Sequence, residues 1–200
     1  MKTSIRLFAA VLFFTVTASL NSSAQAVFWG PGLTENMHGF ANGLTGVTLS
    51  TTANEVRVRQ FTLQSSVTIG HITTMLENGA YSTTFNFGIY DSSGNLLLDS
   101  GPFNGSPLLQ GMVQTASVTS ITLSAGTYFF AQSADYGTIQ TVGLSGNGSL
   151  PAAQAIANAV TTRFAIAANA ASGGALPSTL GTLTAEGSNA VGSATPLFEP

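Results

Sequence analysis

Cysteine is absent from this chain and charged side chains are scarce, and each absence excludes a class of protein. A chain without cysteine cannot be a disulfide scaffold. Charged residues make up only 6% of the sequence, whereas ordinary soluble domains contain about 25%. The solvent-facing surface must therefore consist mainly of Ser, Thr, Asn, Gln and Gly. Copies of such a chain repel one another weakly, which favours close packing against neighbours or neutral polymers.

The N-terminus has the pattern of a cleavable signal peptide. Lys2 and Arg6 precede an apolar stretch, Leu7 to Leu20, and the Ala-Gln-Ala tripeptide 24–26 supplies a small-x-small cleavage site. The competing interpretation is a membrane anchor. The strongly apolar part ends by Val16, which is short of the roughly 20 apolar residues that a spanning helix needs.

We therefore expect residues 1–26 to be removed and residues 27–200 to form one domain without a transmembrane segment. The expected location is secreted or extracellular, which includes the cell surface and the periplasm.

Basic residues nearly disappear once the signal peptide is removed. Loss of Lys2 and Arg6 from the five basic residues leaves three, and the formal charge changes from −3 to −5. The remaining three are Arg57, Arg59 and Arg163, so no lysine is left. Three scattered arginines cannot form the basic stripe that a phosphate backbone requires, and we expect no nucleic-acid partner.

Short alternating runs separated by turn residues predict an antiparallel β fold. Residues 55–61 alternate Val with Arg and place Arg57 and Arg59 on one face, and residues 91–95 (DSSGN) form a hairpin turn. We expect strands at residues 55–61, 67–69 with 72–76, 84–90, 96–98, 118–123, 127–132, 137–144, 161–168 and 194–199.

The predicted fold is an all-β antiparallel sandwich, jelly-roll-like, with one short helix. The helix is expected near residues 151–160, where Pro151 is followed by an Ala-rich run.

Two segments resemble secreted bacterial β-sandwich modules. Residues 88–97 (GIYDSSGNLL) and 121–129 (ITLSAGTYF) are similar to pre-peptidase C-terminal modules and to jelly-roll domains of tail-fibre and appendage proteins. The segment 176–181 (LPSTLG) and the C-terminal LFEP resemble the tails of uncharacterised exported bacterial proteins. The resemblance implies a β-sandwich and an extracellular bacterial location. Such modules act as carbohydrate binders, attachment domains or assembly subunits, and the fold alone does not choose among them.

Catalytic patterns are missing from the sequence. His38 and His71 are the only imidazoles, and no G-x-S-x-G elbow accompanies them. The eight acidic residues show no pattern of paired carboxylates. We therefore expect neither enzymatic activity nor a cofactor, and a hydrolase of unrecognised type is the weakest of three interpretations.

A calcium site is a weak candidate at the predicted hairpin. Asp91, Asn95 and Asp99 surround the turn, and their oxygens suit Ca²⁺. The spacing lacks the dense acidic loop of an EF-hand, however, and a turn-capping role explains Asp91 better. No metal site is otherwise expected, because two lone histidines without cysteine do not make a zinc site.

Three aromatic residues are the candidate ligand-binding residues: Trp29, Tyr90 and Tyr136. Their rings would form a stacking platform for the sugars of a neutral glycan. The alternative is that aromatic residues on alternating strands fill the sandwich core.

A structural role accounts for more of the composition. We expect a non-catalytic extracellular structural or adhesive module, a surface, matrix or appendage subunit that assembles with its own copies. Terminal strands at residues 27–29 or 196–199 are candidates for pairing with a neighbour's sheet. The alternative is a carbohydrate-binding module that recognises a neutral polysaccharide.

Overall fold

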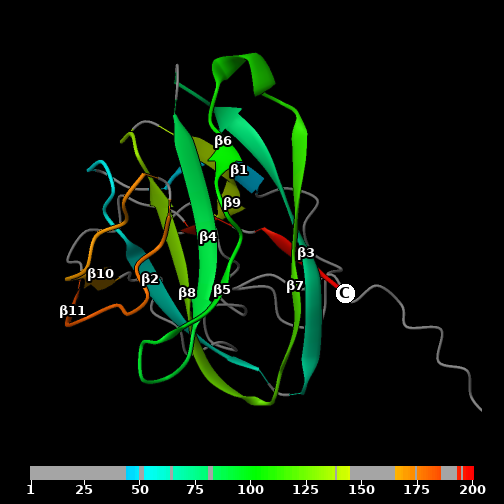
Figure 1. Cartoon of the computed structure of the whole chain (residues 1–200). Helices are drawn as coiled ribbons and strands as arrows, with labels where there is room; N and C mark the ends of the chain where they lie inside the picture. The colour runs from blue at the N-terminus through cyan, green and yellow to red at the C-terminus, as the bar shows by residue number, and fades with distance from the viewer. Residues whose placement is uncertain are drawn as a thin grey trace, which may run out of the picture.

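The protein is an all-β sandwich of two antiparallel sheets, as its sequence predicts (Figure 1). The computed structural model describes residues 44–49, 52–63, 65–80, 83–137, 139–144, 165–173, 175–185, 193–194 and 196–200. The predicted signal peptide, Trp29 and the predicted helix at 151–160 lie outside the described residues.

The first sheet has six strands in the described part of the chain. They are β1 (Leu44–Thr48), β3 (Val67–Asn78), β7 (Val113–Leu123), β9 (Gln140–Leu144), β12 (Ser193–Ala194) and β13 (Leu197–Glu199). The long β3 is central: β7 pairs with one of its edges, and β13 and β9 pair with the other. β9 in turn pairs with β1 and β12.

The second sheet follows the order β11-β10-β2-β8-β4-β5, with β6 also paired to β4. Its strands are β2 (Arg57–Leu63), β4 (Thr84–Tyr90), β5 (Leu96–Asp99), β6 (Phe103–Asn104), β8 (Gly126–Ala134), β10 (Ala165–Ala167) and β11 (Leu183–Ala185). One turn of 3-10 helix, η2 (Pro107–Leu109), precedes β7. No helix among the described residues is long and apolar enough to cross a membrane.

The predicted strands that fall in the described residues are present, and β7 is longer than predicted. It begins at Val113 instead of residue 118, because β3 pairs with the polar segment 113–117 over its full length. The predicted 91–95 turn joins β4 to β5. The short strands β1, β6 and β11 were not predicted from the alternation, and the strand predicted at residues 194–199 corresponds to the end of β12 and to β13.

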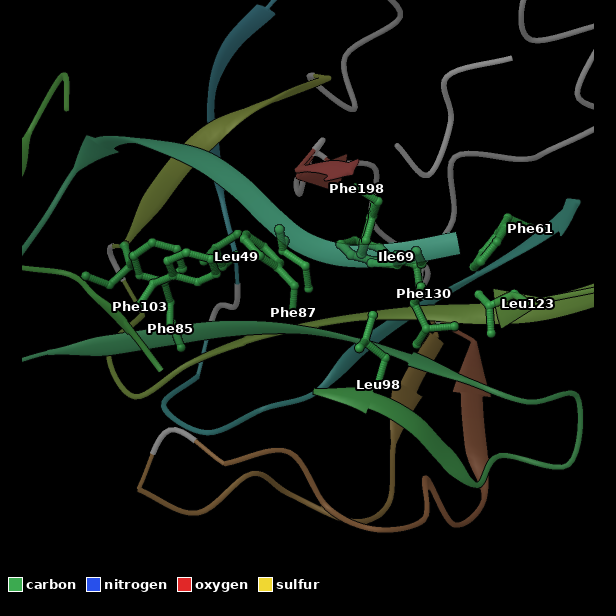
Figure 2. Packing of buried hydrophobic residues seen from close by; sticks show 14 of the residues in the cluster. Leu49, Phe61, Ile69, Phe85, Phe87, Leu98, Phe103, Leu123, Phe130 and Phe198 are labelled. Carbon is green, nitrogen blue, oxygen red and sulfur yellow. The ribbon is translucent and has the colours of Figure 1, made fainter. Parts of the chain in front are cut away.

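Aromatic side chains fill the space between the two sheets. β4 contributes Phe85, Phe87 and Ile89 from alternate positions, and all three are fully buried. Figure 2 shows Phe85 and Phe87 among the packed side chains. The ring of Phe130 on β8 stacks on Phe87 with centroids 5.9 Å apart and meets Phe198 of β13 edge-on at 6.5 Å. The C-terminal strand is thereby part of the main core.

A second apolar cluster covers the outer face of the second sheet. Residues 165–185 begin and end as strands β10 and β11 at one edge of this sheet, and the segment between these strands packs over β2, β8 and β4, where it buries Val58 and Tyr90 beneath Leu176 and Leu180. Gly88 makes this contact possible: a Cβ there would lie 2.4 Å from Leu176 Cδ1 and 2.8 Å from the Leu98 carbonyl oxygen. β4 is consequently buried on both faces.

Replacement of Gly88 by alanine should destabilise the protein. The added methyl group overpacks the contact with Leu176, and we expect a loss of about 1–3 kcal/mol in the free energy of unfolding, measured by chemical denaturation. Leu176→Ala should recover part of this loss when combined with Gly88→Ala, giving a coupling energy of about 0.5 kcal/mol or more.

Gly126→Ala is the matched control, since its Cβ would meet Tyr128 at an ordinary 3.6 Å. It should cost less than about 0.5 kcal/mol. Strict additivity of the Gly88 and Leu176 changes would contradict the packing described.

Candidate functional site

The three predicted ligand-binding aromatics do not form a common platform in the described residues. Trp29 lies outside them. Tyr90 is fully buried, and its hydroxyl donates a 2.7 Å hydrogen bond to the Pro177 carbonyl, which leaves no ring face for a sugar. Burial and the nearby Asp99 charge raise the Tyr90 pKa. Tyr136, between β8 and β9, has half of its surface exposed (50%).

The weak calcium candidates bind groups of the protein itself. The Asp91 carboxylate accepts hydrogen bonds of 2.9 Å from the Ser93 and Asn95 amides and from the Asn95 side chain. Asp91 thus caps the β4–β5 turn, which is the alternative role that the sequence suggested. These donors, the Asn95 side chain first, hold the Asp91 pKa below its usual range.

Asp99 belongs to a different cluster. It lies four positions along the chain from Asn95, or about 13 Å at 3.3 Å per residue. Its carboxylate accepts hydrogen bonds from the Asn86 side chain and from the backbone amides of Gly101 and Leu176. It therefore helps to fix residues 165–185 on the sheet. Within the described residues, no three His, Asp or Glu side chains form a metal-binding group.

The C-terminal strand is docked in its own sheet, which corrects the expectation that residues 196–199 are available to a neighbour. Phe198 pairs with Ile72 of β3 and is buried in the core. His71 Nδ1 lies 3.1 Å from the Pro200 carbonyl oxygen on the surface. β13 stays in its own sheet because the Phe198 ring packs between the two sheets.

The long strand that is left with an unpaired edge is β7. In the described part of the chain it pairs with β3 alone, and it contains eleven residues without a single charge or proline. The other outer strands are shorter or covered: β11 and β1 have three and five residues, and residues 178–180 hydrogen-bond to the start of β5. An uncharged edge of this length is a template for another strand.

Hydroxyl groups line the outer face beside this edge. Thr68 and Thr73 of β3 form 2.9 Å hydrogen bonds across to Thr122 and Thr115 of β7. Ser117 pairs with His71 between them. The β3–β7 face is thus polar but nearly free of charge.

Exposed apolar side chains lie at the start of β7. Leu108, Met112 and Val113 are exposed to 82%, 53% and 65%. Apolar groups that gather on a surface in this way mark interaction sites. The sequence analysis did not identify this region, although the absence of charge along residues 113–123 (VQTASVTSITL) indicated it.

The described residues therefore form an antiparallel β-sandwich whose long edge strand β7 pairs on one side with β3. Comparison with family models, curated proteins and solved structures finds no significant match.

Replacement of Asp91 by asparagine should make the stability of the protein less sensitive to acid. A carboxyl group whose pKa is lowered by folding stabilises the protein above the unfolded-state pKa, and this contribution is lost as the pH falls through the folded-state pKa. We expect acidification below about pH 4 to lower the urea midpoint of the wild type more than that of Asp91→Asn.

Ser92→Asn changes the same turn without changing its charge and should keep the wild-type pH dependence. Equal acid sensitivity of the wild type and Asp91→Asn would show that the Asp91 hydrogen bonds contribute nothing to stability.

Proposed function

We propose that the protein is a non-catalytic extracellular structural or adhesive module that associates with its own copies through β7. The observation that carries the proposal is the uncharged edge of Val113–Leu123, which no strand other than β3 pairs with in the described part of the chain. The likeness of residues 88–97 and 121–129 to modules of appendage proteins supports the same role.

Two copies would pair through β7 in antiparallel orientation. The register between β3 and β7 shifts between Ile69 and His71 of β3, which leaves β7 irregular near residues 118–120. The segment 113–117 is therefore the regular part of β7. Antiparallel pairing of one segment with itself obeys two-fold symmetry and closes as a dimer. The backbone groups of segment 113–117 that face away from β3 gain hydrogen-bond partners, and Val113 and Met112 lie beside the new contact.

The lack of charge on β7 favours a second copy of the chain as the partner. Lysine on an edge strand is a common device against edge-to-edge pairing, and the chain has no lysine after Lys2. A second copy brings an equally uncharged strand, so pairing desolvates no charged group on β7. A strongly basic or acidic partner would find no complementary charge there.

Two lysines on β7 should prevent dimerisation. We expect Ser117→Lys combined with Thr119→Lys to weaken the dimer by about tenfold or more, because the new charges would lie at the pairing edge opposite uncharged residues of the other copy. Both positions are exposed. Analytical ultracentrifugation over a wide concentration range measures the dissociation constant.

Ser92→Lys with Ser93→Lys adds the same charge to the exposed β4–β5 turn and controls for general repulsion. It should leave dimerisation near the wild-type value. A wild-type protein that stays monomeric at every concentration, or a β7 variant that dimerises like the control, would overturn the proposal.

A neutral glycan is the second candidate partner, and the half-exposed ring of Tyr136 is the observation that favours it.

We expect Tyr136→Ala to reduce retention on insoluble neutral polysaccharide about two- to tenfold, the range that one aromatic contact supports. Tyr90→Phe, which removes only a buried hydroxyl group, should retain wild-type binding and lose about 1 kcal/mol of stability. Unchanged retention of Tyr136→Ala would contradict a role for this ring.

A further inference from the structure

Arg59 is a buried cation inside the sandwich. It lies on the face of β2 that also carries Phe61 and Leu63, both part of the core between the sheets. Only 5% of its surface is exposed. Phe130 lies directly opposite on β8, so aromatic carbon rather than water occupies this side of the arginine.

Two of its nitrogens have nothing to bind in the described part of the chain. Nε and Nη2 of Arg59 are buried and make no hydrogen bond. These two atoms lie on the same edge of the planar guanidinium group and point their N–H bonds in parallel. Such an edge matches an anion with two adjacent oxygen atoms, above all a carboxylate.

The acidic residue nearest in sequence is already engaged. Glu55 Oε1 accepts a 2.6 Å hydrogen bond from Nε of Arg57, the other buried arginine of β2. Arg57 and Arg59 share one face of the strand, but only Arg57 has an acidic partner among the described residues.

The region between the sheets contains further polar atoms. Gln132 pairs with Arg57 across the strands and donates a 2.8 Å hydrogen bond to the Leu49 carbonyl oxygen. On the facing sheet, the hydroxyl groups of Thr74 and Thr141 are buried without a hydrogen-bond partner in the described residues. The inner faces of both sheets therefore carry polar atoms that are not satisfied by the described chain.

Burial does not remove the charge of Arg59. Desolvation lowers its pKa to about 10, and the group remains protonated at neutral pH. A buried, unpaired cation is strongly unfavourable unless an anion accompanies it.

We propose that Arg59 is the receptor of a small carboxylate anion, which its Nε and Nη2 atoms bind together. The carboxylate supplies the two acceptors that the described residues do not, and it neutralises the buried charge. This ligand site is separate from the pairing of β7 and does not depend on it.

Formate tests the proposal directly. At constant ionic strength, replacing chloride by formate should raise the unfolding temperature of the wild-type protein by about 5–10 °C once formate is a hundredfold above its dissociation constant. Chloride is the reference because a single spherical ion cannot offer each of the two parallel N–H groups its own acceptor atom, as the two oxygens of a carboxylate do. Arg59→Met should abolish the difference between the two anions, and Arg59→Lys, which keeps the charge without the fork, should lose most of it.

Gln60→Met alters the exposed neighbour of Arg59 on the same strand and should respond to formate like the wild type. A second measurement needs no variant: the Arg59 Nε–H resonance should shift saturably when formate is added. The proposal is overturned if formate and chloride stabilise the wild type equally, if Arg59→Met keeps the full response, or if no arginine resonance shifts.

Discussion

The burial of β4 on both faces is the constraint on which the arrangement of the layers depends. One face places Phe85, Phe87 and Ile89 against the first sheet, and the other places Tyr90 and the bare backbone of Gly88 beneath residues 165–185. A strand in this position needs cover on both sides, because its apolar rings would otherwise face water. The hydrogen bonds of Asp99 and Tyr90 to backbone groups at positions 176 and 177 hold the outer cover in place.

The two sheets consequently meet solvent in different ways. The second sheet lies between the core and residues 165–185, whereas the first sheet presents its β3–β7 face and one long edge to the outside. The hydroxyl pairs of that face and the exposed side chains near Met112 are the surface through which the molecule is best suited to meet a partner. A surface this poor in charge favours neutral partners, among which a second copy of the chain is the simplest.

β2 shows how strand periodicity places charged groups in a core. Val58 must face residues 165–185 and Phe61 must face the first sheet. Side chains alternate strictly along a strand, so once these two residues are placed, Arg57 and Arg59 must point to the same side as Phe61, toward the first sheet. The two arginines then differ only by their partners: Glu55 binds Arg57, and an added carboxylate is the partner inferred for Arg59.

The sequence by itself determined the all-β class, most strand positions, the Asp91 turn and the lack of charge, because alternation, turn residues and composition are local properties. It also placed Arg57 and Arg59 on one face, but it did not tell which face was inside. Only the tertiary structure decided that Tyr90 is buried, that residues 197–199 dock on β3 and that β7 pairs with β3 alone among the described strands. Each of these depends on pairing between segments far apart in the chain, and a local pattern carries no information about which distant strand or loop will cover it.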